Sequence, residues 1–192
     1  MAGTRRRLVC FVLGAFAITA IAVLWQQSFD GILAVEEFQP AIDQAAVEAG
    51  LENPDLLAAL VYAESRGNPA AVSSVGALGL CQLLPTTAVE LALRHGISGP
   101  PWSPADNLRM GAHYLAELLL MFDHNVDLAL LAYRLGPGRV SRLIMEAGSP
   151  SSYIKALRRR RPSAWEYRTQ IMRFEQRFRE RRLALQSLDE PS

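Results

Sequence analysis

A single glutamate near the end of a predicted helix is the residue best placed for acid–base chemistry. Leu57, Leu60, Val61 and Glu64 recur at spacings of three and four, so they share one face of an α-helix. The carboxyl group of Glu64 is therefore directed toward the apolar side of this helix rather than toward water. Burial disfavours the charged form of a carboxyl group and raises its pKa, which suits a general acid working near neutral pH.

The segment that follows Glu64 supplies polar groups and glycines. It reads ESRGNPAAVSSVGALGLCQLLPTTA up to Ala88, which we interpret as a helix end, a polar loop and the start of a new helix. Such a loop can fold back over the glutamate, because glycines permit close backbone approach. Ser65, Ser73 and Gln82 offer hydroxyl and amide groups suited to the hydroxyl and N-acetyl groups of a sugar. An ordinary helix–loop–helix connection with polar filling is the alternative.

The body of the chain is predicted to be all-α. Apolar residues recur at three and four positions, and the two-residue alternation typical of strands is almost absent. Prolines and polar caps mark helix starts, with Asn53 as the expected cap of the second helix, and glycines mark helix ends. These signals place helices at 35–49, 54–65, 85–96, 104–122, 125–134, 138–147, 152–160 and 163–187.

The long last helix carries one apolar stripe. Tyr167, Ile171, Phe174 and Phe178 recur at spacings of four, three and four, with arginines over most of the remaining surface. We predict that this stripe docks onto the body and that the arginines are solvated. A coiled coil with a partner is the alternative, although three heptads are barely enough for one.

The N-terminus has the pattern of an export or anchoring segment. Arg5–Arg7 precede eighteen uncharged residues, 8–25, that end in Trp25. Eighteen apolar residues are just enough to span a bilayer, and flanking arginines stay in the cytoplasm. We therefore predict an inner-membrane anchor with the rest of the chain in the periplasm. A cleaved signal peptide is the alternative, because Ala20–Ala22 has the small-x-small form of a cleavage site.

The charge is nearly balanced overall but unevenly distributed. The formal charge of the 192 residues is +1, which argues against a protein that coats nucleic acid. Residues 26–154 carry six basic and fourteen acidic side chains, whereas residues 155–182 carry eleven basic and three acidic ones. If the basic segment has a partner, we expect anionic lipid or an anionic wall polymer; a solvated face is the alternative.

Cysteines and histidines give no sign of a disulfide, a metal or a cofactor. Cys10 lies in the predicted anchor and Cys81 in the body, so a bond between them would have to cross from membrane to globule. The three histidines, His95, His113 and His124, have no metal-ligand spacing with these cysteines. We expect them to be surface or helix-packing residues, and we predict neither a metal nor a cofactor.

Three groups of residues at fixed spacing carry a resemblance to a known family. The first comprises Glu64-Ser65, Pro69, Ala71, Ser73, Gly76-Ala77, Gly79-Leu80, Gln82, Pro85 and Thr87-Ala88. The second and third have the forms N-x-x-x-G-x-x-Y-L at 107–115 and A-Y-x-x-G-P-G-x-V at 132–140. Together they resemble the lytic transglycosylase catalytic domain, a lysozyme-like fold related to goose-type lysozyme. Tyr167, Ile171 and Met172 resemble its closing tyrosine helix more loosely.

The resemblance implies a role for each matching site residue. Glu64 would be the single catalytic acid and base. The residues implied to line the saccharide groove are Ser65, Ser73, Gln82, Tyr133 and Tyr167. Tyr153 is the alternative to Tyr167, because Ser163-Ala164-Trp165 departs from the usual lead-in to that helix.

Three further positions depart from the family pattern. Cys81 stands where methionine is usual, Arg134 where asparagine is usual, and Leu135 where a small residue is common. The cysteine keeps a soft apolar contact. Arg134 brings a charge beside the groove, so we expect it to alter substrate preference or the placement of its loop.

The resemblance also implies a reaction. Glu64 would protonate the β-1,4 glycosidic oxygen between N-acetylmuramic acid (MurNAc) and N-acetylglucosamine (GlcNAc), and 1,6-anhydroMurNAc ends would form without water. Two alternatives are open. One is a lysozyme-type muramidase with a second carboxylate such as Asp106 or Asp123, although we expect each of these to be a helix cap or surface acid. The other is an inactive module that binds the cell wall.

The expected organisation follows from these observations. Residues 1–26 form the signal-anchor, 27–36 a short linker, 37–180 the lytic transglycosylase-like domain and 181–192 a C-terminal tail. The expected partners are peptidoglycan glycan strands, the membrane through the N-terminal helix and an envelope or secretion complex, with no nucleic acid.

Overall fold

The structure, a computed structural model, describes residue 26 and residues 30–160 and 162–189. Its regular elements are helices, together with two isolated β-bridges in the loop after α3. The helices run in the order α2 (Gln39–Ala49), α3 (Pro54–Ser65), α4 (Pro85–Arg94), α5 (Pro104–Met121), α6 (Val126–Leu135), α7 (Pro137–Ala147), α8 (Pro150–Arg160) and α9 (Pro162–Asp189). The predicted all-α fold is confirmed for these residues.

From α3 onward, the helices begin and end within two residues of the expected positions. The first expected helix is wrong at its start, because the chain turns at 37–38 and α2 begins at Gln39. Pro40 gives the physical reason. Proline lacks an N–H and its ring clashes with the carbonyl four residues earlier, so it is tolerated only in a first helical turn.

Residues 30–36 lie in the segment expected to be a linker, yet they are helical. The side chains of Ile32 and Val35 are buried in the main core. This short helix therefore packs on the body. The predicted membrane anchor and its rival cleavage site lie outside the described residues. Within the part of the chain that the structure describes, no helix combines the length and apolarity needed to cross a membrane.

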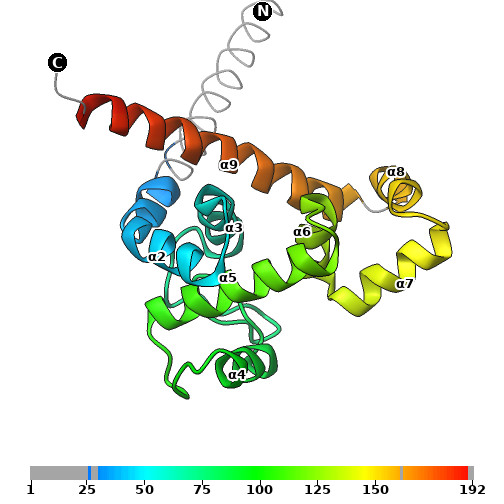
Figure 1. Cartoon of the computed structure of the whole chain (residues 1–192), viewed down its shortest axis with the longest axis horizontal. Coiled ribbons are helices and arrows are strands. Elements are labelled where there is room, and N and C mark those ends of the chain that lie inside the picture. The colour runs from blue at the N-terminus through cyan, green and yellow to red at the C-terminus, as the bar shows by residue number, and fades with distance from the viewer. Residues whose placement is uncertain (1–25, 27–29, 161, 190–192) are drawn as a thin grey trace, which may run out of the picture.

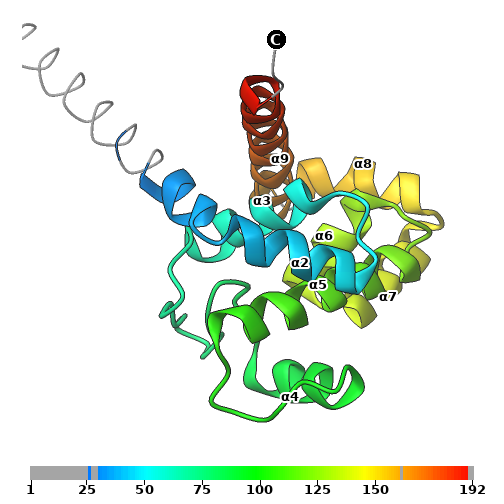
Figure 2. The same ribbon diagram turned by 60° about the vertical axis from the view of Figure 1, so that its left-hand side comes forward.

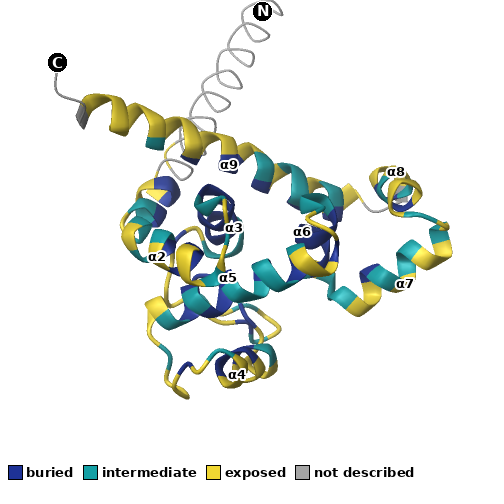
Figure 3. Cartoon of the chain, viewed as in Figure 1, coloured by how far each residue is buried: buried dark blue, intermediate teal, exposed yellow. Residues whose placement is uncertain are grey.

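Helix α3 forms the centre of the fold. Helix α9 crosses it on one side, while α2 and α5 lie below it in the view of Figure 1. All residues from Leu56 to Tyr62 are buried, and α3 is accordingly dark blue around its circumference in Figure 3. The sequence pattern predicted burial of only one face of this helix. More of its surface is buried, because neighbouring helices cover more than one face of α3. Figure 2 shows α4 on the far side of α5, away from α9.

Helix α9 docks along its apolar stripe, as predicted. Tyr167, Ile171, Phe174 and Phe178 are all buried in the same cluster as the α3 side chains. Burying four such side chains contributes several kcal/mol at about 1.5–3 kcal/mol each. This packing places residues of the last helix beside the end of α3.

Polar contacts fix the register of α9. Arg182 donates to the carboxylates of Asp55 and Asp43, each at 2.9 Å. Asn53, the expected side-chain cap of α3, makes no capping bond and instead donates to buried Glu175 at 2.9 Å. The backbone position of the cap is correct, but a tertiary partner takes its amide group.

Helices α6, α7 and α8 surround a second, smaller core that includes Tyr153 and Leu157. In Figure 1, α7 and α8 lie to one side of the rest of the body. Tyr153 is 5% exposed within this cluster, and the tyrosine that reaches α3 is Tyr167.

Gly111 of α5 lies so close to Cys81 in the loop after α3 that a larger residue at position 111 should destabilise the fold. A Cβ at Gly111 would lie 2.3 Å from Cys81 Sγ and 2.7 Å from its Cβ. Gly111→Ala should therefore cost about 1–3 kcal/mol, the usual range for overpacking, despite alanine's better helix propensity. Urea unfolding measures this free energy.

Gly138 provides the matched control. It lies in α7, and a Cβ added there would have no atom within 4 Å. Gly138→Ala should stabilise the protein by about 0.5–1 kcal/mol. Equal effects of the two substitutions would contradict the close contact at Gly111.

Candidate active site

Glu64 lies in the last turn of α3 and is partly buried. Its Oε1 accepts a hydrogen bond of 2.5 Å from the hydroxyl of Tyr167 on α9. Burial raises the pKa of Glu64, while the Tyr167 hydrogen bond and the positive charge of Arg134 partly oppose that rise. Glu64 therefore stays protonated to higher pH than an exposed glutamate, as a general acid requires.

Arg134 covers Tyr167 from the end of α6. Its guanidinium carbon lies 4.6 Å from the centre of the Tyr167 ring, within the range of a cation–π contact. Burial and the negative charge of Glu64 raise the pKa of Tyr167 well above its ordinary value. Tyr167 thus remains a neutral donor to Glu64, clamped between a carboxyl group and a guanidinium.

The loop between α3 and α4 is held in place by α5. Asn107, which is buried, accepts from the backbone N–H of Cys81 at 2.8 Å and donates to the carbonyl of Leu78 at 3.1 Å. A Cβ at Gly79 would lie 2.7 Å from the Asn107 amide nitrogen, and Gly79 has a positive φ of 75°. Glycine is required there for both reasons.

Three of the expected groove residues use polar atoms to hold local structure. Ser65 donates to the carbonyl of Val61 at 3.1 Å, and Ser73 accepts from the N–H of Ala77 at 3.0 Å. The Gln82 amide nitrogen donates to two loop carbonyls, each at 3.0 Å. Of these groups, the amide oxygen of Gln82 is best placed to serve a ligand, because Gln82 also lines a cleft.

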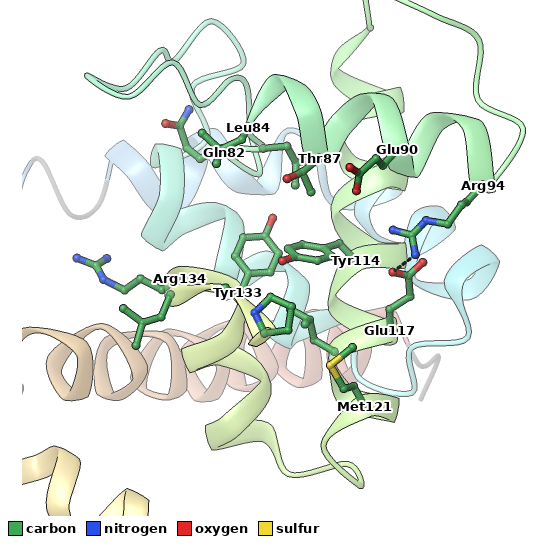
Figure 4. A pocket seen from close by; sticks show the side chains of 15 residues that line it. Gln82, Leu84, Thr87, Glu90, Arg94, Tyr114, Glu117, Met121, Tyr133 and Arg134 are labelled. Carbon is green, nitrogen blue, oxygen red and sulfur yellow. Dashed lines mark hydrogen bonds and ion pairs between the residues drawn. The ribbon is translucent and has the colours of Figure 1, made fainter. Parts of the chain in front are cut away.

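That cleft has a volume of about 530 Å³ and lies between α4, α5 and the α6–α7 turn. The two tyrosines at its centre are Tyr114 and Tyr133, with ring centres 5.1 Å apart (Figure 4). The lining residues are Gln82, Leu83, Leu84, Thr87, Glu90, Arg94, Tyr114, Glu117, Leu118, Met121, Tyr133, Arg134, Leu135, Gly136 and Pro137.

Glu64 adjoins this cleft without being among the residues that line it. Glu64 and the lining residue Arg134 both contact Tyr167, so Glu64 lies close to the cleft. Burial raises the pKa of Tyr133 well above its ordinary value, and the negative charge of Glu64 adds to that rise. The Tyr133 hydroxyl donates to the carbonyl of Cys81 at 2.8 Å. Tyr133 therefore offers a ligand its ring more than its hydroxyl.

A second hollow, of about 320 Å³, borders the same loop. Ala71, Gly79 and Asn107 line it together with Trp102 and neighbouring prolines. Concave surface therefore flanks the α3–α4 loop on two sides, near Gln82 and near Gly79. This arrangement suits an extended ligand.

The two other candidate carboxylates, Asp106 and Asp123, are a helix cap and a surface acid, as expected. Asp106 forms a capping box with Ser103 at the start of α5, and Asp123 is exposed after α5. The carboxylates that line the cleft are Glu90 and Glu117, neither of which stands out in the sequence. No local sequence signal identifies them, because only the fold brings α4 and α5 together.

Glu117 is already paired. It accepts from Arg94 at 2.8 Å and contacts His95 at 2.8 Å. The His95 ring stacks on His113 with centres 3.8 Å apart, so these two histidines pack between helices as expected. Among the described residues, no group of three or more His, Cys, Asp or Glu side chains could hold a metal ion.

Removal of the Tyr167 hydroxyl should change the pH dependence of activity. In Tyr167→Phe, Glu64 loses the hydrogen bond that lowers its pKa, so its pKa rises. Activity that needs protonated Glu64 should then be lost at higher pH than in the wild type, with kcat roughly tenfold lower because the carboxyl group is less well held. The pH–rate profile measures both effects. If the loss of activity at high pH moved to lower pH in Tyr167→Phe, the stabilising role of this hydrogen bond for the Glu64 carboxylate would be contradicted.

Fold and site together define an all-α, lysozyme-like domain in which the partly buried carboxyl group of Glu64 lies beside a cleft. The family model described as the transglycosylase SLT domain matches residues 41–155. The chain belongs to this family, as the resemblance in its sequence predicts.

Two relatives and one solved structure illustrate the similarity. The transglycosylase of Enterobacteria phage PRD1 is 38% identical over 100 residues, covering 52% of this chain and 35% of the relative. An endo-type membrane-bound lytic murein transglycosylase A of Klebsiella pneumoniae is 39% identical over 88 residues, covering 43% of each. An inactive mutant of the lytic transglycosylase Slt of Pseudomonas aeruginosa, with glutamine replacing a glutamate, superposes with a TM-score of 0.63 at 28% identity.

The structural match covers 71% of this chain and 23% of the Slt chain. This chain thus matches less than half the length of each of these three proteins.

Proposed function

We propose that this protein is a peptidoglycan lytic transglycosylase with Glu64 as its single acid and base. The observation that carries the proposal is the partly buried Glu64 carboxyl group, held by Tyr167 next to a cleft. Membership of the family and the names of the relatives support the reaction and the substrate.

The first step is protonation of the leaving group. Protonated Glu64 donates its proton to the oxygen between MurNAc C1 and GlcNAc O4, the C1–O bond breaks, and GlcNAc leaves with a free 4-hydroxyl. The acetamido group of MurNAc assists departure by sharing the positive charge that develops at C1. This substrate group takes the place of the second carboxylate of ordinary glycosidases.

The second step regenerates the acid. Ionised Glu64 takes the proton from the C6 hydroxyl of the same MurNAc, and O6 attacks C1 to close the 1,6-anhydro ring. No water is consumed, and Glu64 ends the cycle protonated. Tyr167 and Arg134 stabilise the carboxylate that exists between the two steps, because both lower the pKa of Glu64.

The remaining predicted groove residues position the glycan and the loop. Gln82 and Tyr133 line the cleft and would contact sugar through the amide oxygen and the ring. Ser65 and Ser73 would act through the loop that they brace. We propose residues 1–26 as the anchor, 37–180 as the catalytic domain and the periplasmic face of the inner membrane as the location. The expected linker and tail were wrong in part, because residues 30–36 form a helix that packs on the core and α9 continues to Asp189.

Solubilisation of purified sacculi tests for an enzyme rather than a wall-binding module. The full chain should release soluble fragments, and Glu64→Gln should still sediment with sacculi but release fragments at least about a hundredfold more slowly. Sedimentation of the wild type with sacculi without any release would contradict the proposal and favour the binding module.

A further inference from the structure

The setting of Arg134 distinguishes it from the other arginine of the cleft. One face of its guanidinium lies over Tyr167 at 4.6 Å, and its side chain is exposed and lines the cleft. Figure 4 shows Arg134 on one side of Tyr133 and Tyr114, and the Arg94–Glu117 pair on the other.

The two arginines differ in their charge balance. Arg94 is paired with Glu117 at 2.8 Å. No ion pair joins Arg134 to a carboxylate anywhere in the described part of the chain. The nearby carboxyl group, Glu64, is uncharged when it is ready to act as an acid. Arg134 therefore presents an uncompensated positive charge to the cleft.

We propose that Arg134 binds the free lactyl carboxylate of MurNAc and so makes this protein selective for glycan strands without stem peptides. This inference rests on the proposed function. A guanidinium with one face packed on a ring keeps its N–H edge free, and that edge matches a carboxylate in a bidentate arrangement.

The chemistry of the substrate places the anion near Arg134. MurNAc carries its lactyl group at C3, on the same sugar whose C1–O bond Glu64 would cleave. In a peptide-free strand this group ends in a carboxylate, whereas in a peptide-bearing strand it is an amide without charge. Carboxylates of the stem peptide lie further along a flexible chain, so the lactyl carboxylate is the anion fixed closest to Glu64 and its neighbour Arg134.

The substrate defines the reaction that must come before. Hydrolysis of the amide bond between the lactyl group and the stem peptide produces the carboxylate that Arg134 would bind. Cleavage by this protein would thus follow peptide removal.

Kinetics on two matched substrates test the proposal. Strands from one batch of sacculi are used either directly or after an amidase has removed the peptides, and kcat/KM is measured with the full chain. The wild type should favour peptide-free strands. In Arg134→Asn the ratio of kcat/KM on peptide-free to peptide-bearing strands should fall about tenfold, mainly through KM, because a bidentate charged contact is lost.

Two further variants separate the roles of charge and geometry. Arg134→Lys keeps the positive charge but cannot bind a carboxylate through two parallel N–H groups, so it should retain part of the selectivity. Arg139→Asn removes an exposed arginine of α7 that does not line the cleft, and its ratio should equal that of the wild type.

Other outcomes would overturn the proposal in distinguishable ways. An equal loss of activity on both substrates in Arg134→Asn, with a shifted pH profile, would mean that Arg134 only tunes Glu64. A wild-type preference for peptide-bearing strands that Arg134→Asn removes would mean that it binds the stem peptide. If the wild type cleaves neither substrate, the proposed function fails, and sedimentation of Glu64→Gln and Glu64→Gln/Arg134→Asn with peptide-free strands still tests the carboxylate contact.

Discussion

Glu64→Gln should lower kcat for release of muropeptides by about a hundredfold to ten-thousandfold, the range that general acid–base catalysis contributes. Glutamine cannot donate the proton that the leaving GlcNAc oxygen needs, nor accept one from the C6 hydroxyl. Its amide oxygen can still accept the hydrogen bond from Tyr167, so the end of α3 should keep its structure. The initial rate of release from sacculi measures the effect.

The fold of this variant provides the internal control. Glu64→Gln removes a partly buried ionisable group without changing its shape, so its Tm should stay within a few degrees of the wild type or rise slightly. A Glu64→Gln variant as active as the wild type would exclude Glu64 as the acid and direct attention to Glu90. Glu90 lines the cleft and forms no salt bridge within the part of the chain that the structure describes.

Asn107→Ala should cause a larger loss of stability than any other polar substitution proposed for this protein. It removes the acceptor for the Cys81 N–H, and a buried donor left without a partner costs about 1–3 kcal/mol. It also removes one donor to the Leu78 carbonyl, which still accepts from the N–H of Leu83 at 3.1 Å, so this second loss costs only about 0.5–1.5 kcal/mol. We expect a loss of about 2–4 kcal/mol and, for a chain of this size, a fall in Tm of about 4–16 °C.

The same substitution should also reduce activity, because the α3–α4 loop carries Gln82 into the cleft. Asn68→Ala is the matched control. Asn68 belongs to the same loop and accepts a backbone bond from Ala70, but it is exposed, so its loss should cost less than about 1 kcal/mol. Equal melting curves for the two variants would show that Asn107 does not hold the loop.

Much of the fold follows from local sequence signals. Prolines at helix starts and glycines at helix ends helped to place α3 to α9 closely. Proline fixes its own φ, and glycine readily adopts the left-handed conformation that ends a helix. The apolar stripe of α9 was also predictable, since its four residues face one neighbour. The start of α2 was predicted wrongly. The expected helix 35–49 placed Pro40 beyond the first helical turn, whereas proline is accommodated only within that turn.

The candidate site could be predicted only in part. The partial burial of Glu64 follows from its place on an apolar helix face, and its contact with Tyr167 joins residues 103 positions apart. The resemblance named both residues, but no local signal could show that the hydroxyl contacts the carboxyl group. Arg134 stacking on Tyr167, Glu175 taking the Asn53 amide and Glu117 reaching the cleft likewise depend on how helices pack.

The fate of water during cleavage tests the central claim most directly. Sacculi are digested by the full chain in heavy-oxygen-labelled water, and the new MurNAc ends are analysed by mass spectrometry. The proposed mechanism predicts 1,6-anhydroMurNAc ends without label, because O6 of the substrate attacks C1. Reducing MurNAc ends that carry the label at C1 would contradict it and identify a hydrolase in which water is the nucleophile.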